Sequence, residues 1–258
     1  MSLTTRERAT AALYGELHRH ATETFARDYL LPGLRLHLEQ LGLDPDRALA
    51  GAAMLDGGCG GFAGGADAAL ALGARTVTGV DLSAENVRSA RERFADEPGA
   101  RFVRANLLSL PFASEQFDFV YSNGVLMITE DPERAFRELV RMTKPGGRIY
   151  IGVYGRGGLY NEIFVPLAKL GGRLVPQAVT RRLLRLVPRL LRPSSSLMDV
   201  MYVPIEIHYR IDEIRDWFAA VGLEATFLRH YYQPPTWLNR LLFGDGTMIF
   251  FSAVKPRP

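Results

Sequence analysis

A glycine-rich turn preceded by an acid is the first feature of the sequence that suggests chemistry. The segment Asp56-Gly57-Gly58-Cys59-Gly60-Gly61-Phe62-Ala63 directly follows a short apolar run at residues 52–55. Glycines let the backbone approach a ligand closely, and a helix that starts after such a turn points its free N–H groups and positive dipole end at that ligand. The turn therefore predicts a nucleotide-binding site, with a plain strand-to-helix turn as the alternative.

The carboxylate of Asp81 is the second candidate. It lies 21 residues after Gly60, at the end of an apolar run at residues 76–80. A carboxylate in that position can accept hydrogen bonds from both hydroxyls of an adenosine ribose. The alternative is an acid at a helix N-terminus, beside the capping residue Ser83. Because residues 58–63 also fit the dinucleotide pattern G-x-G-x-x-A, the turn and Asp81 together leave NAD and other adenosine cofactors open.

These residues require a sheet whose strands end at a common edge. Short apolar runs alternate with helical patterns between residues 51 and 154, which predicts βαβ units and a mostly parallel sheet. The predicted strands are 52–55, 76–80, 101–104, 117–121 and 148–154, and the predicted helices are 62–72, 83–95 and 132–142. After a helix at 211–221, strands 223–231 and 248–254 are predicted to close the sheet as an antiparallel pair at its edge.

The regions on either side of this core are predicted to be helical. Leucines at helical spacing predict two helices within residues 4–42, with a break at Pro32-Gly33. Repeated glycines and prolines, together with a leucine–arginine run, predict a helical lid or insertion. The chain is thus divided into an N-terminal helical cap (1–50), a core (51–154), a lid (155–205) and a C-terminal completion of the core (206–258).

Composition is that of an ordinary globular protein, with 47% apolar and 23% charged residues. The net charge of +3 is too small to indicate a nucleic-acid partner by itself. Cys59 is the single cysteine, so we expect neither a disulfide framework nor a metal site. No apolar run is long enough to cross a bilayer and the N-terminus does not resemble a signal peptide, so we expect a cytoplasmic protein.

Three later segments distinguish between the cofactors. They are Asn106-Leu107-Leu108-Ser109-Leu110-Pro111-Phe112, Phe117-Asp118-Phe119-Val120-Tyr121-Ser122-Asn123 and Arg141-Met142-Thr143-Lys144-Pro145-Gly146-Gly147. With the glycine turn, in this order and spacing, they resemble the class I S-adenosylmethionine (SAM)-dependent methyltransferases. The resemblance is to the small-molecule branch that includes the ubiquinone and menaquinone biosynthesis enzymes, and it covers about residues 51–154. It implies a Rossmann-like sheet and SAM as cofactor, and it disfavours NAD.

The resemblance also assigns the methionine end of the cofactor to the glycine turn. It implies that Asp56 and the backbone of Gly57, Gly58 and Gly60 hold this part of SAM. The methionine amine is cationic and its carboxylate anionic, so an acid beside exposed N–H groups is a suitable pairing.

The adenosine end is assigned to the next two strand ends. The resemblance implies that Asp81 binds the ribose and that Leu82 lies against the adenine. Asn106 is expected to bind the adenine amino group, and Leu107 to offer its backbone N–H. Relatives more often carry Asp at the position of Asn106, but an amide oxygen can accept the same hydrogen bond.

Below the reactive methyl group, the resemblance places Ser122 and Asn123 at the end of the fourth strand. We take Asn123 as a candidate catalytic residue. Relatives often carry one or two histidines in the segment that follows, where this chain has Met127 and Ile128. The obvious general base is therefore missing, and this part of the pocket is predicted to be apolar.

Candidate bases outside the core are His208 and Tyr209, in the segment that returns from the lid to the last helix. Methyl transfer is a displacement at carbon in which the protein mainly aligns the nucleophile and excludes water. A base is required only when the nucleophile holds a proton at its own pKa. The alternative is an extended segment in which Tyr209 packs and His208 faces water.

The lid is markedly basic. Between Arg156 and Arg192 there are eight Lys or Arg residues and a single acid, Glu162. This charge suits an anionic substrate, an anionic membrane surface or a carrier-protein partner, with the solvated face of an amphipathic lid helix as the alternative. A homodimer is also compatible with the sequence.

Three functions follow in order of preference. The first is a SAM-dependent methyltransferase acting on a small molecule in secondary or cofactor metabolism. The second is an enzyme of the same fold in which the amine of SAM attacks a carbon next to sulfur, giving cyclisation or aminoalkyl transfer with release of methylthioadenosine. The third is a non-catalytic SAM- or NAD-binding protein. The acceptor molecule is not specified by the sequence.

Overall fold

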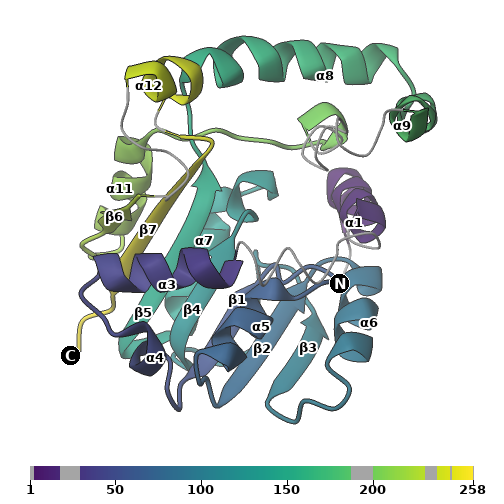
Figure 1. Cartoon of the computed structure of the whole chain (residues 1–258). Helices are drawn as coiled ribbons and strands as arrows, with labels where there is room; N and C mark the ends of the chain where they lie inside the picture. Colours follow the sequence, from purple (N-terminus) through teal and green to yellow (C-terminus); the bar gives the residue numbers. More distant parts are fainter. Residues whose placement is uncertain (1–2, 18–29, 187–199, 230–236, 245, 258) are drawn as a thin grey trace.

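The computed structural model describes residues 3–17, 30–186, 200–229, 237–244 and 246–257. Seven strands form one sheet in the order β3-β2-β1-β4-β5-β7-β6 (Figure 1). The strands are β1 (Ala53–Gly57), β2 (Thr76–Asp81), β3 (Ala100–Arg104), β4 (Phe117–Asn123), β5 (Thr143–Tyr154), β6 (Thr226–Leu228) and β7 (Met248–Val254). The first five are parallel, whereas β7 pairs antiparallel with both β5 and β6. The predicted mixed, mostly parallel sheet is confirmed, with the antiparallel β7 one place inside the edge strand β6.

Helices cover both faces of the sheet and create two buried layers. The main helices are α5 (Gly64–Ala71), α6 (Ala84–Arg93), α7 (Pro132–Met142) and α11 (Ile211–Ala219). One layer packs α5 and α6 against the sheet, and the other packs α7 and α11. The strand order reverses between β1 and β4, which is the position where open α/β sheets bind ligands.

The predicted helix starts have clear physical causes. The Ser83 hydroxyl accepts the Asn86 N–H and begins α6, and the Asp131 carboxylate accepts the Arg134 N–H and begins α7. Residues 144–147 contain a proline and two glycines but lie within β5, where the pairing with β4 shifts register.

The N-terminal region forms α1 (Thr5–Leu17), α3 (Leu31–Gln40) and the short α4 (Pro45–Ala48). The predicted break at Pro32-Gly33 is wrong, because both residues lie in the first turn of α3. Proline is tolerated there because the N–H that it lacks has no partner within the helix. α3 packs into the α5 layer, whereas α1 crosses the start of α6.

The lid connects β5 to α11 and is largely helical over the residues described. It comprises a π-helical turn (Tyr160–Phe164), α8 (Val165–Leu174) and α9 (Gln177–Leu186). α12 (Trp237–Phe243), which the sequence did not predict, lies beside the start of this lid. Part of the basic run, residues 187–192, lies outside the described residues. Figure 1 shows α8 and α12 above the carboxyl ends of the parallel strands.

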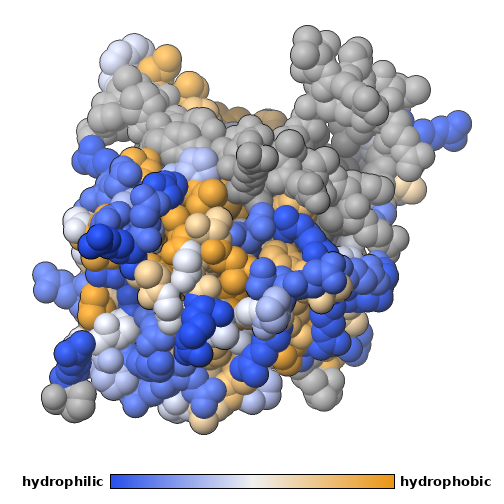
Figure 2. All heavy atoms as spheres, turned by 60° about the horizontal axis from the view of Figure 1, so that its bottom comes forward, coloured by the Kyte–Doolittle hydropathy of each residue, from blue (hydrophilic) through white to orange (hydrophobic). Residues whose placement is uncertain are grey.

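The opposite end of the molecule, where the parallel strands begin, is hydrophilic over much of its rim (Figure 2). Among the helices that the structure describes, none combines the length and apolar character needed to cross a membrane.

Candidate active site

The glycine turn after β1 folds back onto the end of β2. The backbone N–H groups of Gly58 and Cys59 both donate to Val80 O, at 2.8 and 2.9 Å. Gly58 has φ +87° and Gly60 has φ +65°, values that favour glycine. A Cβ on Gly58 would lie 2.3 Å from Val125 Cγ2, so no side chain fits there. The turn is therefore a fixed cradle at the switch point of the sheet.

Asp81 joins this cradle to the start of α6. Its Oδ2 accepts the Gly60 N–H at 2.9 Å, and its Oδ1 accepts the Ser83 N–H at 2.8 Å and the Asn86 side-chain amide at 3.1 Å. The carboxylate is half-buried at the carboxyl edge of the sheet. The helix-start interpretation is supported, because Asp81 orders the beginning of α6, and its contact with a ribose stays a prediction.

Asp56 lies at the end of β1, as the sequence predicts, but it is buried. Its side chain is only 2% exposed, beneath the start of α5, and accepts the Ala66 N–H. A Cβ on Gly65 would come within 2.6 Å of Asp56 Oδ2, so the helix approaches closely. Burial, with the nearby charge of Asp81, raises the pKa of Asp56 to about 7. Asp56 Oδ2 is buried and has no hydrogen-bond partner among the described residues, so the expected contact with the methionine amine stays a prediction.

Asn123 ends β4 on the same face as Asp56. Its side-chain amide donates to Tyr121 Oη at 3.1 Å, and the Tyr121 ring stacks on Tyr150 with a centroid separation of 5.1 Å. Asn123 Oδ1 is buried and accepts no hydrogen bond from any described residue. A buried acceptor without a donor suits a ligand that brings one, such as a cationic amine.

Two other expectations for this strand end are corrected. Ser122 is fully buried and donates to Gly57 O at 2.8 Å, so it braces β1 against β4 and does not face a ligand. Met127 and Ile128 are buried in the α7 layer, so they are core residues and not an apolar pocket wall. Leu107 is also buried, which leaves only its backbone for a cofactor, whereas Leu82 is half-buried at the edge.

Asn106 is held by an acid from α1. Its Oδ1 accepts the Leu108 N–H at 2.9 Å, and its amide donates to Glu7 Oε1 at 2.5 Å. Glu7 is buried, and its Oε2 accepts the Thr4 N–H while the Thr4 hydroxyl accepts the Glu7 N–H. This reciprocal pair is a capping box. The Glu7 carboxylate therefore lies directly beside Asn106, at the position where relatives often carry Asp.

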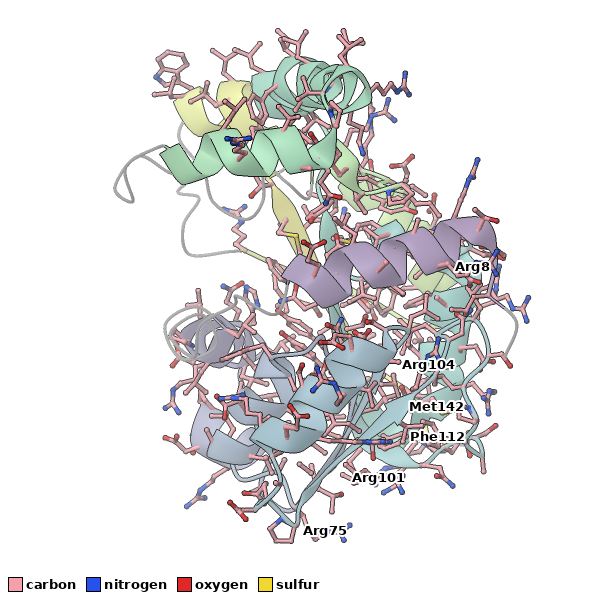
Figure 3. The ribbon with its side chains drawn as sticks, turned by 90° about the vertical axis from the view of Figure 1, so that its right-hand side faces the viewer. Arg8, Arg75, Arg101, Arg104, Phe112 and Met142 are labelled. Carbon is pink, nitrogen blue, oxygen red and sulfur yellow. The ribbon has the colours of Figure 1, made fainter. Side chains whose placement is uncertain are left out.

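From the contact between Glu7 and Asn106, helix α1 runs towards the ribose end of the site. Gly15 lies so close to the start of α6 that a Cβ there would be 2.8 Å from Ser83 Oγ. In Figure 3, α1 lies between the lid helices above and the core below. The helix thus spans the ends of β2 and β3, where adenosine is expected.

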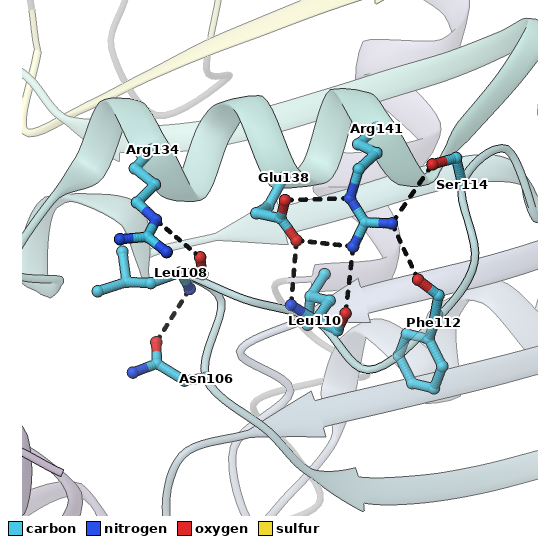
Figure 4. A network of polar contacts seen from close by, with 8 residues as sticks. All are labelled: Asn106, Leu108, Leu110, Phe112, Ser114, Arg134, Glu138 and Arg141. Carbon is cyan, nitrogen blue, oxygen red and sulfur yellow. Dashed lines mark hydrogen bonds and ion pairs between the residues drawn. The ribbon is translucent and has the colours of Figure 1, made fainter. Parts of the chain in front are cut away.

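The turn after β3 is fastened to α7 by charged side chains (Figure 4). Arg134 donates to Leu108 O at 3.0 Å, and Glu138 accepts the Leu110 N–H at 3.0 Å. Arg141 pairs with Glu138 at 2.8 Å and lowers the pKa of that carboxyl. This network holds the turn rigidly beside the sheet.

His208 is occupied on both ring nitrogens. Nε2 lies 3.0 Å from Glu206 Oε1 and Nδ1 lies 3.1 Å from Gly155 O, so each ring nitrogen faces an acceptor. Glu206, whose side chain is 1% exposed, also pairs with Lys169 of α8 at 2.7 Å. Burial raises the pKa of Glu206, but the bonds from His208 and Lys169 outweigh it and leave the pKa lowered. His208 is therefore held by contacts on both ring nitrogens and does not face water.

Tyr209 packs in the core. Its ring meets Trp217 edge-on with a centroid separation of 4.8 Å, and burial raises its pKa. Its backbone N–H donates to Tyr154 O at 2.9 Å. The packing interpretation of Tyr209 is supported, and its expected role as a base is corrected.

Sequence reasoning missed Glu7, Glu206 and Lys169. The first had a readable signal, because Thr4-x-x-Glu7 matches the capping-box pattern. The Lys169–Glu206 pair joins residues 37 positions apart and had no local signal.

A Rossmann-like sheet with a glycine cradle at its switch point, an acid after β2 and a polar turn after β3 defines an adenosine-cofactor enzyme. A family model described as a methyltransferase domain matches residues 55–151. A demethylmenaquinone methyltransferase from Clavibacter sepedonicus is 30% identical over 177 residues, which cover 69% of this chain and 67% of that protein. A malonyl-[acyl-carrier protein] O-methyltransferase from Pectobacterium atrosepticum is 34% identical over 137 residues. That alignment covers 51% of this chain and about half, 52%, of the relative.

Solved structures share the fold over nearly the whole chain. The [4+2]-cyclase SpnF has a TM-score of 0.62 and 16% identity, with 100% of this chain and 98% of that chain covered. The magnesium protoporphyrin IX methyltransferase from Synechocystis PCC 6803 with bound SAH has a TM-score of 0.57 and 15% identity, with 97% of both chains covered. The chain belongs to the class I SAM-dependent methyltransferases, in the small-molecule branch, and its cofactor is SAM.

Proposed function

We propose that this enzyme transfers the methyl group of SAM to a small molecule whose nucleophile ionises without help from an enzymic base. The observation that carries the proposal is the engagement of both His208 nitrogens, with Tyr209 packed in the core. A nucleophile that is already anionic or neutral with a free lone pair needs only alignment. A carboxylate, an enolate or an amine meets that requirement.

The residues at the carboxyl edge fit the cofactor from one end to the other. Asp81 would bind the ribose hydroxyls, and Asn106, oriented by Glu7, would accept from the adenine amino group. Gly58 and Gly60 would let the backbone approach the methionine part, whose amine matches the buried oxygen of Asn123. When bound, SAM supplies a methyl group on a positively charged sulfur, and the chain has only to hold it in line with the acceptor.

The return segment from the lid would exclude water from this edge. The Ile207 N–H donates to Met127 O at 3.0 Å, and the Tyr209 N–H donates to Tyr154 O at 2.9 Å. These bonds tie the segment to the turn that follows β4 and to the end of β5. The ion pair between Lys169 and Glu206 joins α8 to the same segment, so it holds the lid against the return segment.

The cofactor site is tested by calorimetry with SAM on an Asp81→Asn variant. We expect at least about a tenfold loss of affinity, because hydrogen bonds to a charged group contribute roughly 1.5–3 kcal/mol. Asp118→Asn is the matched control, since Asp118 pairs with Lys144 at the opposite end of the sheet. Equal affinity of Asp81→Asn and the control would refute the assignment.

The reaction is tested by mass spectrometry of SAM incubated with the enzyme and candidate acceptors. A demethylated quinone and a malonyl thioester are the first to try, since the names of two relatives specify these acceptors. Acceptor-dependent S-adenosylhomocysteine would support methyl transfer. Methylthioadenosine formed without any acceptor would overturn it in favour of attack by the amine of SAM on its own side chain.

A further inference from the structure

The outer side of the lid is apolar where a solvent-facing helix is ordinarily polar. Leu167 and Leu174 of α8 are 62% and 73% exposed. They belong to a row of exposed apolar side chains at helical spacing. The row is Leu159, Ile163, Leu167, Leu170 and Leu174.

The inner side of α8 is already packed, so the row cannot belong to the core. Gly172 lies so close to the segment below that a Cβ there would be 2.2 Å from Met201 O. Lys169 points the same way and pairs with buried Glu206. The helix is thus anchored by small and charged residues and presents its leucines outwards.

Two neighbouring helices extend the apolar surface. On α9, Val179 and Leu183 are exposed. On α12, Leu238 and Leu241 are exposed and Trp237 is 76% exposed. Figures 1 and 3 show these helices on the same side of the molecule, beyond the carboxyl edge of the sheet. We refer to the outer sides of α8, α9 and α12 as the lid face.

The charge around the lid face selects its partner. Arg156, Arg173 and Arg182 are exposed, and Glu162 is the single acid in the sequence stretch 156–192. Apolar side chains bordered by arginines, with an exposed tryptophan, match helices that lie in the headgroup region of anionic bilayers. A twofold dimer through this face would instead bring the arginines of two copies together.

We propose that the lid face docks onto an anionic phospholipid surface, with the leucines and Trp237 in the headgroup–acyl boundary and the arginines on lipid phosphates. The contact is peripheral. The proposal does not depend on which acceptor is methylated. Docking would place the carboxyl edge of the sheet, where the active site lies, near the apolar molecules held in the membrane.

Vesicle binding tests the proposal directly. The protein is titrated with vesicles of phosphatidylcholine alone and of phosphatidylcholine with phosphatidylglycerol, and followed by sedimentation and tryptophan emission. Trp217 is buried, so a blue shift reports on Trp237, the other of the two tryptophans. We expect binding to the anionic vesicles that weakens with salt, and much weaker binding to the neutral ones.

Two pairs of substitutions separate the contributions. Leu167→Gln with Leu174→Gln should weaken binding at least about tenfold by removing buried apolar area. Arg173→Gln with Arg182→Gln should weaken it by roughly fivefold per arginine. Val254→Gln, at an exposed apolar position on the far end of β7, is the control and should bind as the unsubstituted protein does.

Each variant is first checked for SAM binding and thermal unfolding, so that a folding defect is not mistaken for lost lipid contact. Equal binding to vesicles with and without phosphatidylglycerol would overturn the proposal. So would a variant with both leucines replaced that binds vesicles as tightly as the control variant. So does a dimer in light scattering that the leucine pair dissociates, since the lid face would then be a contact between copies.

Discussion

Replacing Asp56 by Asn is expected to stabilise the enzyme at neutral and alkaline pH. The Asp56 carboxyl is buried under α5, and its pKa is raised from 3.8 to about 7. A group whose pKa is raised on folding contributes most stability below its unfolded pKa and loses that contribution as pH rises through the folded pKa. At pH 8 the native protein therefore holds a buried charge that the Asp56→Asn variant does not carry.

The magnitude follows from the difference between the two pKa values. At about 1.4 kcal/mol per pKa unit, the shift corresponds to about 4 kcal/mol of unfolding free energy between low and high pH. Roughly 3 kcal/mol of this change falls between pH 5 and pH 8. Asn keeps an acceptor for the Ala66 N–H, so the hydrogen bond is retained.

Urea unfolding of both proteins at several pH values, without SAM, measures the effect. The stability of Asp56→Asn minus that of the unsubstituted protein should grow steadily from pH 5 to pH 8. Two curves that run parallel over this range would show that the carboxyl titrates normally in the fold and would refute the reasoning.

Asp118→Asn supplies a control of opposite sign. Burial raises the pKa of Asp118, but bonds from Lys144 and the Ala53 N–H outweigh it and leave the pKa lowered. Its contribution is present above the unfolded pKa and lost as pH falls through the folded pKa. The substitution should therefore destabilise by less than about 1 kcal/mol, because this pair is partly exposed, and the loss should not change between pH 5 and pH 8.

Two further predictions concern the cofactor site. Glu7→Gln preserves the capping box but removes the negative charge that lies beside the Asn106 amide. The calorimetric affinity for SAM should therefore fall about fivefold. Asn106→Asp alone should also weaken binding, because it places two carboxylates together, whereas the double variant should recover most of the loss; additive losses would contradict the pairing. Burial raises the pKa of the Cys59 thiol well above its ordinary value, and the charges of two nearby aspartates raise it further. Native protein at pH 8 should react with a thiol reagent at least about tenfold more slowly than urea-unfolded protein, and an equal rate would show that Cys59 is accessible.

Much of the core could be predicted from local patterns. β2 begins at Thr76 as expected, and α7 spans the predicted residues 132–142. Apolar runs and caps act over a few residues, so their signals lie within the sequence itself. The position of Asp81 at a strand end is of the same kind, because the strand length and the following cap determine it.

The roles of individual side chains depended on partners far away in the chain. The sequence makes His208 a candidate base, whereas in the structure its two ring nitrogens contact Glu206 and Gly155. The burial of Asp56 beneath α5 is likewise visible only in the structure. Neither covering element is specified by the motif that contains the residue.

The sequence by itself determined the class of sheet and the order of its motifs, because these depend on periodicity and spacing within about a hundred residues. The cofactor followed from the resemblance of those motifs to a known family. Only the tertiary structure decided which polar groups remain available at the carboxyl edge. Glu7 reaches Asn106 across 99 positions, and a hydrogen bond or a burial penalty depends on such distances in space.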